Sequence, residues 1–237
     1  MERLDKIIAN RGIASRREVK ELVRQGRVLV DGVPASASDM KVSPETAAIT
    51  VDGVAVSGER YTYLLLHKPA GVLTATEDRR QPTVMELLPE QYRRRGLAPV
   101  GRLDKDTEGL LLLTDDGELT HRLLSPRYHV DKVYYARVDG TPDQADAAAF
   151  AAGLLLGDGL QCLPARLEPL GGDACLVTLR EGKFHQVKRM LASRGKPVRY
   201  LKRLAMGPLR LEDTLKAGQW RLLTPEELSA LRMACGQ

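Results

Sequence analysis

The ten residues G-R-L-D-K-D-T-E-G-L at positions 101–110 run directly into the hydrophobic stretch Leu110–Leu113. Four leucines followed by Thr114-Asp115-Asp116-Gly117 predict a short buried strand that ends in a turn. The loop before the strand holds three acidic and two basic side chains. Because a buried strand holds the preceding loop firmly, this position suits a catalytic carboxylate, which needs rigid support. The same composition is also typical of a surface loop whose charges only keep it solvated.

A calcium loop is an alternative interpretation of this stretch. Asp104, Asp106 and Glu108 are spaced like the first ligands of an EF-hand, and Asp115 stands at the twelfth position. Leucines at the seventh to tenth positions, a short Asp at the twelfth and a strand instead of a helix afterwards argue against calcium. We therefore expect no metal here.

The pattern G-R-L-D-x-x-T-x-G-L resembles the active-site motif of RNA pseudouridine synthases, in which the aspartate is the nucleophile. This resemblance implies that Asp104 is the catalytic residue and that Arg102 supports it. A match over ten residues is fairly specific, and it predicts that companion motifs of the same enzymes occur elsewhere in the chain.

Composition indicates a globular protein of 237 residues with one large domain or two smaller ones. Hydrophobic residues make up 43% of the chain, which is enough for a packed core, and no run of eighteen apolar residues predicts a membrane span. The N-terminus is charged from Glu2 onward and lacks the apolar centre of a signal peptide. Cys162, Cys175 and Cys235 are widely spaced and odd in number, which favours reduced thiols in a cytoplasmic protein.

The net charge of +5 is distributed unevenly. Between Arg180 and Arg203, nine Lys or Arg residues stand against a single acid, and residues 1–30 carry eight bases and four acids. An ordinary solvated surface mixes the two signs. The two basic regions therefore predict a polyanion that is contacted at two places.

The first sixty residues predict two small helices followed by hairpins. A short helix ends before Gly12, and a second helix begins at the capping box Ser15-Arg16-Arg17-Glu18 and ends at Gly26. Asp31-Gly32 and Asp52-Gly53 each predict a tight turn between two short strands.

This arrangement resembles an S4 RNA-binding domain over residues 2–57, including its Gly26-Arg27-Val28-x-Val30-Asp31-Gly32 signature. Such a module has no chemistry of its own and would deliver the rest of the chain to RNA. The alternative is that its arginines only solubilise a small fold. The basic residues expected to contact RNA phosphates are Arg11, Arg16, Arg17, Lys20, Arg24 and Arg27.

Two further motifs resemble those of the same enzymes. Residues 61–66 predict a buried strand that leads into Lys68-Pro69-Ala70-Gly71, a K-P-x-G turn from which Lys68 is expected to contact RNA. Alternation predicts a strand over Lys132–Val138, which contains a K-x-Y motif. By this resemblance Tyr134 stacks on the target base, although a Tyr in a strand is ordinarily a core or edge residue.

Residues 181–190, E-G-K-F-H-Q-V-K-R-M, begin a predicted helix and are similar to a third motif, whose basic residue pairs with the nucleophilic aspartate. Lys188 matches that position, as in the RsuA-type branch of these enzymes. Because a lysine is a point charge and not a bidentate fork, Arg189 stays open as the partner. His185 and Arg189 are also expected to contact RNA.

The remaining elements are predicted from local signals. Thr141-Pro142 predicts the start of an alanine-rich helix that reaches about Ala152. Residues 160–170 and 174–180 predict two strands, and Thr224-Pro225-Glu226-Glu227 predicts the first turn of the last helix.

The chain is thus expected to have an α+β fold with two domains. A small S4-like domain is predicted over residues 1–58 and a catalytic domain over residues 59–237, with Gly58-Glu59-Arg60 as the linker. By resemblance, the catalytic domain has a mixed, mainly antiparallel sheet with flanking helices and a central cleft. No heptad pattern appears, so we expect a monomer.

The resemblance implies isomerisation of a uridine to pseudouridine in ribosomal RNA, most closely the small-subunit (16S) RNA of the RsuA type. The reaction conserves every atom, so no cofactor is expected, and the target base must first leave its stack. The expected partner is ribosomal RNA or a ribosomal subunit under assembly. A synthase of large-subunit (23S) RNA and a non-catalytic protein that binds ribosomal RNA are the alternatives.

Overall fold

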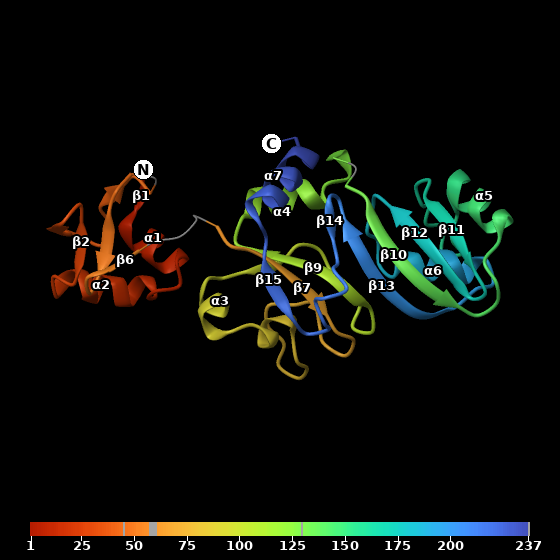
Figure 1. Ribbon diagram of the computed structural model, residues 1–237, viewed down its shortest axis with the longest axis horizontal. Coiled ribbons are helices and arrows are strands. Elements are labelled where there is room, and N and C mark those ends of the chain that lie inside the picture. Colours follow the sequence, from red (N-terminus) through yellow and green to blue (C-terminus); the bar gives the residue numbers. More distant parts are fainter. Residues whose placement is uncertain (45, 57–60, 129, 237) are drawn as a thin grey trace. The chain divides into compact units, whose positions relative to one another are not determined.

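The computed structural model describes residues 1–44, 46–56, 61–128 and 130–236 and has an α+β fold with two compact units (Figure 1). The first unit comprises Met1–Thr62 and Leu88–Ala98, and the second comprises Tyr63–Leu87 and Pro99–Gln237. The predicted linker and domain boundary at residues 58–60 lie outside the described residues.

The segment Leu88–Ala98 groups with the first unit, although the sequence division places it in the second. The reason is close packing at Gly12, where an added Cβ would lie 2.9 Å from Arg95 Cγ and 2.9 Å from Gln91 O. A contact of this kind depends on tertiary packing and leaves no local signal in the sequence.

Short strands and helices build the first unit around one apolar core. Leu4, Ile8, Val19 and Val28 are fully buried in that core. A four-stranded sheet has the order β3-β2-β5-β6, and β1 pairs with β4. The elements are β1 (Glu2–Arg3), α1 (Leu4–Asn10), α2 (Arg16–Arg24), β2 (Val28–Val30), β3 (Val33–Pro34), β4 (Lys41–Val42), β5 (Ile49–Val51), β6 (Val54–Ala55) and α3 (Glu90–Arg94).

The predicted start of the second helix is confirmed, because Ser15 Oγ accepts from Glu18 N at 3.3 Å and Ser15 N donates to Glu18 Oε2 at 2.6 Å. Both hairpins are confirmed as well. Asp31-Gly32 and Asp52-Gly53 all have positive φ, which is the backbone of a type I′ turn.

The second unit is built on one large twisted sheet with the order β11-β12-β10-β13-β9-β7-β15. β14 pairs with β13, and β8 pairs with β9. The elements are β7 (Tyr63–Lys68), a short 3-10 helix (Val84–Leu87), β8 (Ala98–Pro99), β9 (Glu108–Thr114), α4 (Gly117–Leu124), a second 3-10 turn (Pro126–Tyr128), β10 (Lys132–Val138), α5 (Gln144–Ala152), β11 (Arg166–Gly171), β12 (Ala174–Leu179), α6 (Gln186–Ser193), β13 (Val198–Met206), β14 (Leu209–Arg210), β15 (Trp220–Leu222) and α7 (Pro225–Ala234).

The sheet is mixed and mainly antiparallel, as the resemblance implied. β9 and β13 run parallel, with Glu108 opposite Lys202 and Gly109 opposite Arg203, whereas β7 with β9 and β15, β10 with β12 and β13, β11 with β12, and β13 with β14 are antiparallel. Leu110–Leu113 are fully buried at the centre of the sheet. α4 and α7 lie together at one side (Figure 1), where Arg122 Nη1 donates to Gly236 O at 3.2 Å.

The structure bears on two expectations from composition, the state of the cysteines and the absence of a membrane span. Cys162, Cys175 and Cys235 are buried and unpaired, as predicted. In the described ranges, no helix has both the length and the apolar character needed to cross a membrane.

Two predicted boundaries are wrong. The alanine-rich helix begins at Gln144 and not at Pro142, because Asp143 caps it by accepting from Asp146 N at 2.9 Å. The strand predicted over residues 160–170 begins only at Arg166. Pro164 lies among residues 160–165, which do not form the predicted strand, and it has no N–H to donate to a neighbouring strand.

Gly109 allows β9 to approach β13 closely. Its φ is +110°, and an added Cβ would lie 2.2 Å from Arg203 O and 2.6 Å from Arg203 N. We expect Gly109→Ala to lower the free energy of unfolding by roughly 3 kcal/mol or more, because the strained backbone and the steric clash both oppose the native pairing. Urea denaturation measures this loss.

Gly117→Ala is the matched control. Gly117 begins α4, its φ lies outside the positive range, and an added Cβ would meet no atom within 4 Å. Its effect should stay below about 1 kcal/mol. Equal losses in the two variants would show that close approach at Gly109 does not matter.

Candidate active site

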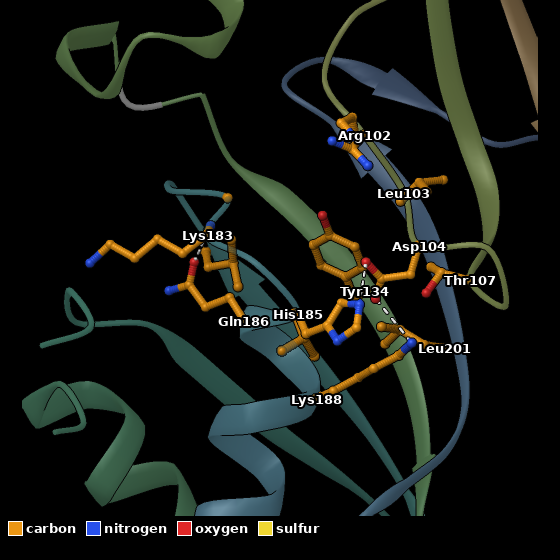
Figure 2. Close-up of a pocket in the computed structure, with 13 residues that line it drawn as sticks. Arg102, Leu103, Asp104, Thr107, Tyr134, Lys183, His185, Gln186, Lys188 and Leu201 are labelled. Carbon is orange, nitrogen blue, oxygen red and sulfur yellow. Dashed lines mark hydrogen bonds and ion pairs between the residues drawn. The ribbon is translucent and has the colours of Figure 1, made fainter. Parts of the chain in front are cut away.

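Asp104 lies in the loop that leads into β9. Its backbone oxygen accepts from Thr107 N at 3.1 Å and from Lys68 Nζ at 3.1 Å, so the main chain is fixed from two sides. The side chain is 26% exposed and lies on the wall of a pocket (Figure 2). Asp104 is therefore held rigidly and stays accessible.

Lys188, from the first turns of α6, extends toward Asp104 (Figure 2). Its Nζ lies 2.9 Å from Asp104 Oδ2 and 2.5 Å from Asp106 Oδ1. Burial favours the neutral amine, but the hydrogen bonds to Asp106 and Asp104 outweigh it and raise the pKa of Lys188 above its ordinary value. Burial likewise opposes the charged form of Asp106, yet the bond from Lys188 lowers its pKa. Lys188 therefore stays a charged ammonium between the carboxylates of Asp104 and Asp106.

Arg189 contacts a different acid. Its Nη2 lies 2.5 Å from Asp158 Oδ2. Consecutive side chains on a helix point about 100° apart, so Lys188 and Arg189 cannot both face the pocket. The structure thus places Lys188, and not Arg189, beside Asp104.

Tyr134 forms another wall of this pocket. It lies in β10, is largely buried, and has its ring next to the Asp104 side chain (Figure 2). The predicted alternation is confirmed, because Lys132, Tyr134 and Ala136 are all buried on one face of the strand. A flat ring in this position can stack on a planar ligand.

His185 lies at the N-terminal end of α6, in a left-handed backbone conformation with a φ of 49°. Its Nε2 is 3.5 Å from Asp104 Oδ1, and its ring stacks on that of Phe184 at a centroid distance of 3.8 Å. Phe184 is 75% exposed, whereas Phe150 is completely buried. Phe184 was not among the residues predicted from the sequence, although an aromatic residue directly before His185 was an available signal.

Arg102 lies at the rim of the site. It is exposed and lines both the pocket around Asp104 and an adjoining cavity of about 640 Å³. This size is in the range of cavities that hold small organic ligands. The two hollows share Asp104, Tyr134 and His185 and so form one continuous site.

The prediction that Lys68 contacts RNA is wrong, because the structure buries this side chain completely. Its Nζ donates to four backbone carbonyls, those of Pro69, Asp104, Lys105 and Thr107, at 2.9–3.2 Å. Burial lowers the pKa of Lys68 to about 8, against the opposing effect of nearby carboxylates. Lys68 therefore organises the Asp104 loop from inside and cannot reach an RNA phosphate.

The RNA-binding role expected for the basic residues of the first unit stays a prediction. Three of them form ion pairs. Arg24 with Glu21 and Arg27 with Asp52 are exposed pairs, whereas exposed Arg16 pairs with the buried carboxylate of Asp5. Arg11 is half-buried, whereas Arg17 and Lys20 are exposed and form no ion pair between described residues. Exposed ion pairs contribute little stability, so Arg24 and Arg27 can exchange their partners for phosphates at little cost.

The calcium alternative does not agree with the geometry. Asp104 and Asp106 face the ammonium of Lys188, and Glu108 Oε2 accepts from Tyr200 Oη at 2.7 Å. Among the described residues, no group of three or more His, Cys, Asp or Glu side chains is arranged to hold a metal ion.

The arrangement defines what the site can do chemically. An accessible carboxylate beside a lysine ammonium can act as a nucleophile that is oriented by charge. Tyr134 and the neighbouring cavity offer space and a stacking surface for a planar ring. Seven of the nine basic residues in the 180–203 segment form ion pairs with carboxylates, so within the described residues Lys202 and Arg203 are the bases of this segment left to attract a negatively charged substrate.

Comparison with protein families gives two matches. A family model described as RNA pseudouridylate synthase matches residues 62–193. A model of the S4 domain matches residues 2–47. Together the two models cover most of the chain in the predicted order.

Several known proteins are similar over nearly the whole length. An uncharacterized RNA pseudouridine synthase, YtzG of Bacillus subtilis, is 46% identical over 97% of this chain and 98% of its own. A ribosomal small subunit pseudouridine synthase A of Pseudomonas aeruginosa is 40% identical over 97% and 100%. A ribosomal large subunit pseudouridine synthase B of Bacillus subtilis is 39% identical over 98% and 96%.

One solved structure is also similar. The crystal structure of a pseudouridylate synthase superposes with a TM-score of 0.69 at 34% identity and covers 98% of this chain and 100% of that chain.

Proposed function

The chain belongs to the RNA pseudouridylate synthase family, and from this premise we propose that it converts a specific uridine of small-subunit ribosomal RNA to pseudouridine with Asp104 as the nucleophile. The observation that carries the proposal is the group formed by Asp104, Lys188 and Tyr134 in one pocket. The three residues come from a loop, a helix and a strand that are far apart in the sequence.

The reaction can be written with these residues and no external reagent. An oxygen of Asp104 adds to the nucleotide, either at the ribose carbon that carries the base or at the uracil ring, and the bond between that ribose carbon and N1 breaks. The uracil turns, its C5 bonds to the same ribose carbon, and the bond between Asp104 and the nucleotide breaks, which restores the free carboxylate. The proton leaves C5 while N1 gains one. Atoms and electrons balance, so the product is an isomer of the substrate.

Each site residue has a physical task in this scheme. Lys188 orients the Asp104 carboxylate and stabilises its negative charge, and Tyr134 stacks on the turned base. The cavity next to Asp104 receives the uridine after it has left its stack. The S4 domain supplies attraction to the RNA backbone.

The choice of small-subunit RNA depends on detailed resemblance. Relatives named for the small and for the large subunit match at almost equal identity. Three stretches of sequence resemble the RsuA type, which acts on small-subunit RNA: Thr114-Asp115-Asp116-Gly117, Ser125-Pro126-Arg127-Tyr128-His129 and the H-Q-V-K-R-M run at 185–190. We extend the proposal to a monomer that acts in the cytoplasm on ribosomal RNA or on an assembling subunit.

The decisive experiment incubates the purified protein with transcribed 16S and 23S RNA in the presence of EDTA. Conversion of one uridine in the 16S transcript is expected, and mapping that position in RNA from cells that lack the gene should show its loss. Conversion in the 23S transcript alone would replace the small-subunit target. Binding without conversion of either RNA would favour the non-catalytic alternative.

Lys188→Met is expected to lower the single-turnover rate of pseudouridine formation about 100-fold or more, because the isosteric side chain leaves Asp104 without its cation. Lys188→Arg should recover part of this rate, since it restores the charge with a different shape. Arg189→Met is the matched control: its partner is Asp158, so the rate should stay within about tenfold. A larger loss at Arg189 than at Lys188 would reverse the assignment.

A further inference from the structure

Two buried cations outside the group described above line the same cavity. Lys132 is 6% exposed and Arg203 is 2% exposed, and both line the cavity of about 640 Å³ beside Asp104 and Tyr134. Lys132 precedes Tyr134 by two residues on the same face of β10, and Arg203 is opposite Tyr134 on β13. The two cations therefore belong to the wall that carries the stacking ring.

The hydrogen bonds of these cations are incomplete. Arg203 Nε donates to Leu110 O at 2.7 Å, whereas its Nη2 is buried and has no hydrogen-bond partner among the described residues. Lys132 Nζ donates to Val130 O at 3.2 Å. A buried guanidinium nitrogen without an acceptor is costly, so the site is suited to an acceptor from a ligand.

Their charges are also unmatched. Neither Lys132 nor Arg203 takes part in an ion pair between described residues. The carboxylate of Asp131, next to Lys132 in the sequence, forms an ion pair with Arg180 at 2.8 Å. Burial and, secondly, the charge of Arg203 lower the pKa of Lys132 to about 8. Two buried cations that repel each other would be stabilised by an anion placed between them.

We propose that Lys132 and Arg203 bind a phosphate of the RNA strand adjacent to the uridine that enters the active site. This inference rests on the proposed function, because it takes the RNA as the ligand. A phosphate supplies both missing elements, an acceptor for Arg203 Nη2 and a negative charge for the cation pair. A uracil carbonyl would supply only the acceptor.

Phosphate binding at this site would also position the substrate. Strand residues two apart are separated by roughly 6.6 Å, so a phosphate held at Lys132 is tied to the backbone beside the ring of Tyr134. Fixing the backbone next to the flipped nucleotide would position its ribose against Asp104. Lys132 and Arg203 are thus positioning residues, whereas the exposed arginines supply general affinity.

The test compares two short RNAs that contain the converted uridine, one unmodified and one with an uncharged methylphosphonate at a single phosphate that flanks this uridine. Each flanking phosphate is replaced in turn, and affinity is measured by competition titration. For the wild-type protein, one of the replacements should weaken binding about tenfold. Lys132→Met should bind the unmodified RNA several-fold more weakly and should reduce the difference between the two RNAs to about threefold, because Arg203 still contacts the phosphate.

Lys105→Met is the matched control, because it removes the same charge from the exposed rim of the same cavity. This variant should keep the tenfold difference between the two RNAs. If Lys132→Met also keeps that difference for each flanking position, Lys132 does not hold a phosphate and the proposal is overturned.

A second measurement separates binding from folding. Lys132→Met replaces a buried charge with an apolar side chain of similar length, so its Tm should equal or exceed that of the wild type. A lower Tm together with unchanged RNA affinity would mean that Lys132 is structural, which overturns the proposal. Conversion of the unmodified RNA by the wild type tests the proposed function alone, whereas the affinity ratio tests only the phosphate site.

Discussion

Asp104→Asn is expected to abolish pseudouridine formation, with a single-turnover rate reduced about 10⁴-fold or more, while affinity for the RNA stays within a factor of about three. An amide has the size of the carboxylate but is too weak a nucleophile to form the covalent bond. Its oxygen can still accept from Lys188, whose Nζ lies 2.9 Å from Asp104 Oδ2. Release of tritium from RNA labelled at C5 of uridine measures the rate, because that position loses its hydrogen.

Asp106→Asn is the control for this prediction. Asp106 contacts the same lysine at 2.5 Å, but its side chain is 75% exposed. The rate should stay within about tenfold of the wild type, since Lys188 keeps Asp104 as a partner. Normal turnover by Asp104→Asn, or a deeper loss in Asp106→Asn, would transfer the nucleophile assignment away from Asp104.

Local signals predicted most elements of the fold because they depend on neighbouring residues only. The four leucines at 110–113 form the central strand, and the box at Ser15 starts its helix. The start of α5 was predicted wrongly, because the carboxylate of Asp143 is a better cap than Thr141 with Pro142 as first helical residue. Where two neighbouring residues can each cap a helix, a small difference in capping free energy decides between them, and the sequence pattern does not show that difference.

The candidate site was predicted through resemblance more than through pattern. Asp104, Tyr134 and Lys188 are each ordinary residues in their local context, and only the family motifs connected them. The structural cause of their proximity is the parallel pairing of β9 with β13, which itself pairs with β10. Such non-local pairing has no signature within any one segment.

The residues that sequence reasoning misjudged are those whose role depends on burial. Lys68 looked like a surface cation beside a turn, yet it is enclosed by carbonyls. Arg203 belonged to a basic segment that was predicted to contact a polyanion from the surface, yet it is 2% exposed and lines the cavity. A charge run thus contained two kinds of cation, and only tertiary packing distinguishes them.

Lys68→Met is expected to lower stability and activity together. The four carbonyls that its Nζ binds belong to Pro69 and to the loop residues Asp104, Lys105 and Thr107. Methionine fills the same volume but donates nothing, so these oxygens lose their shared donor inside the protein. The free energy of unfolding should fall by about 3–5 kcal/mol.

The same substitution should lower turnover about 100-fold or more at a temperature where the variant is still folded, because the Asp104 loop loses its internal anchor. Urea denaturation and the tritium-release rate measure the two effects. Lys105→Met removes a neighbouring charge whose Nζ donates to Gln81 Oε1 at an exposed position, so stability should change by less than about 0.5 kcal/mol. A Lys68→Met protein as stable and as active as the wild type would mean that the loop is held by its own turn, in which Thr107 N donates to Asp104 O, and not by the buried ammonium.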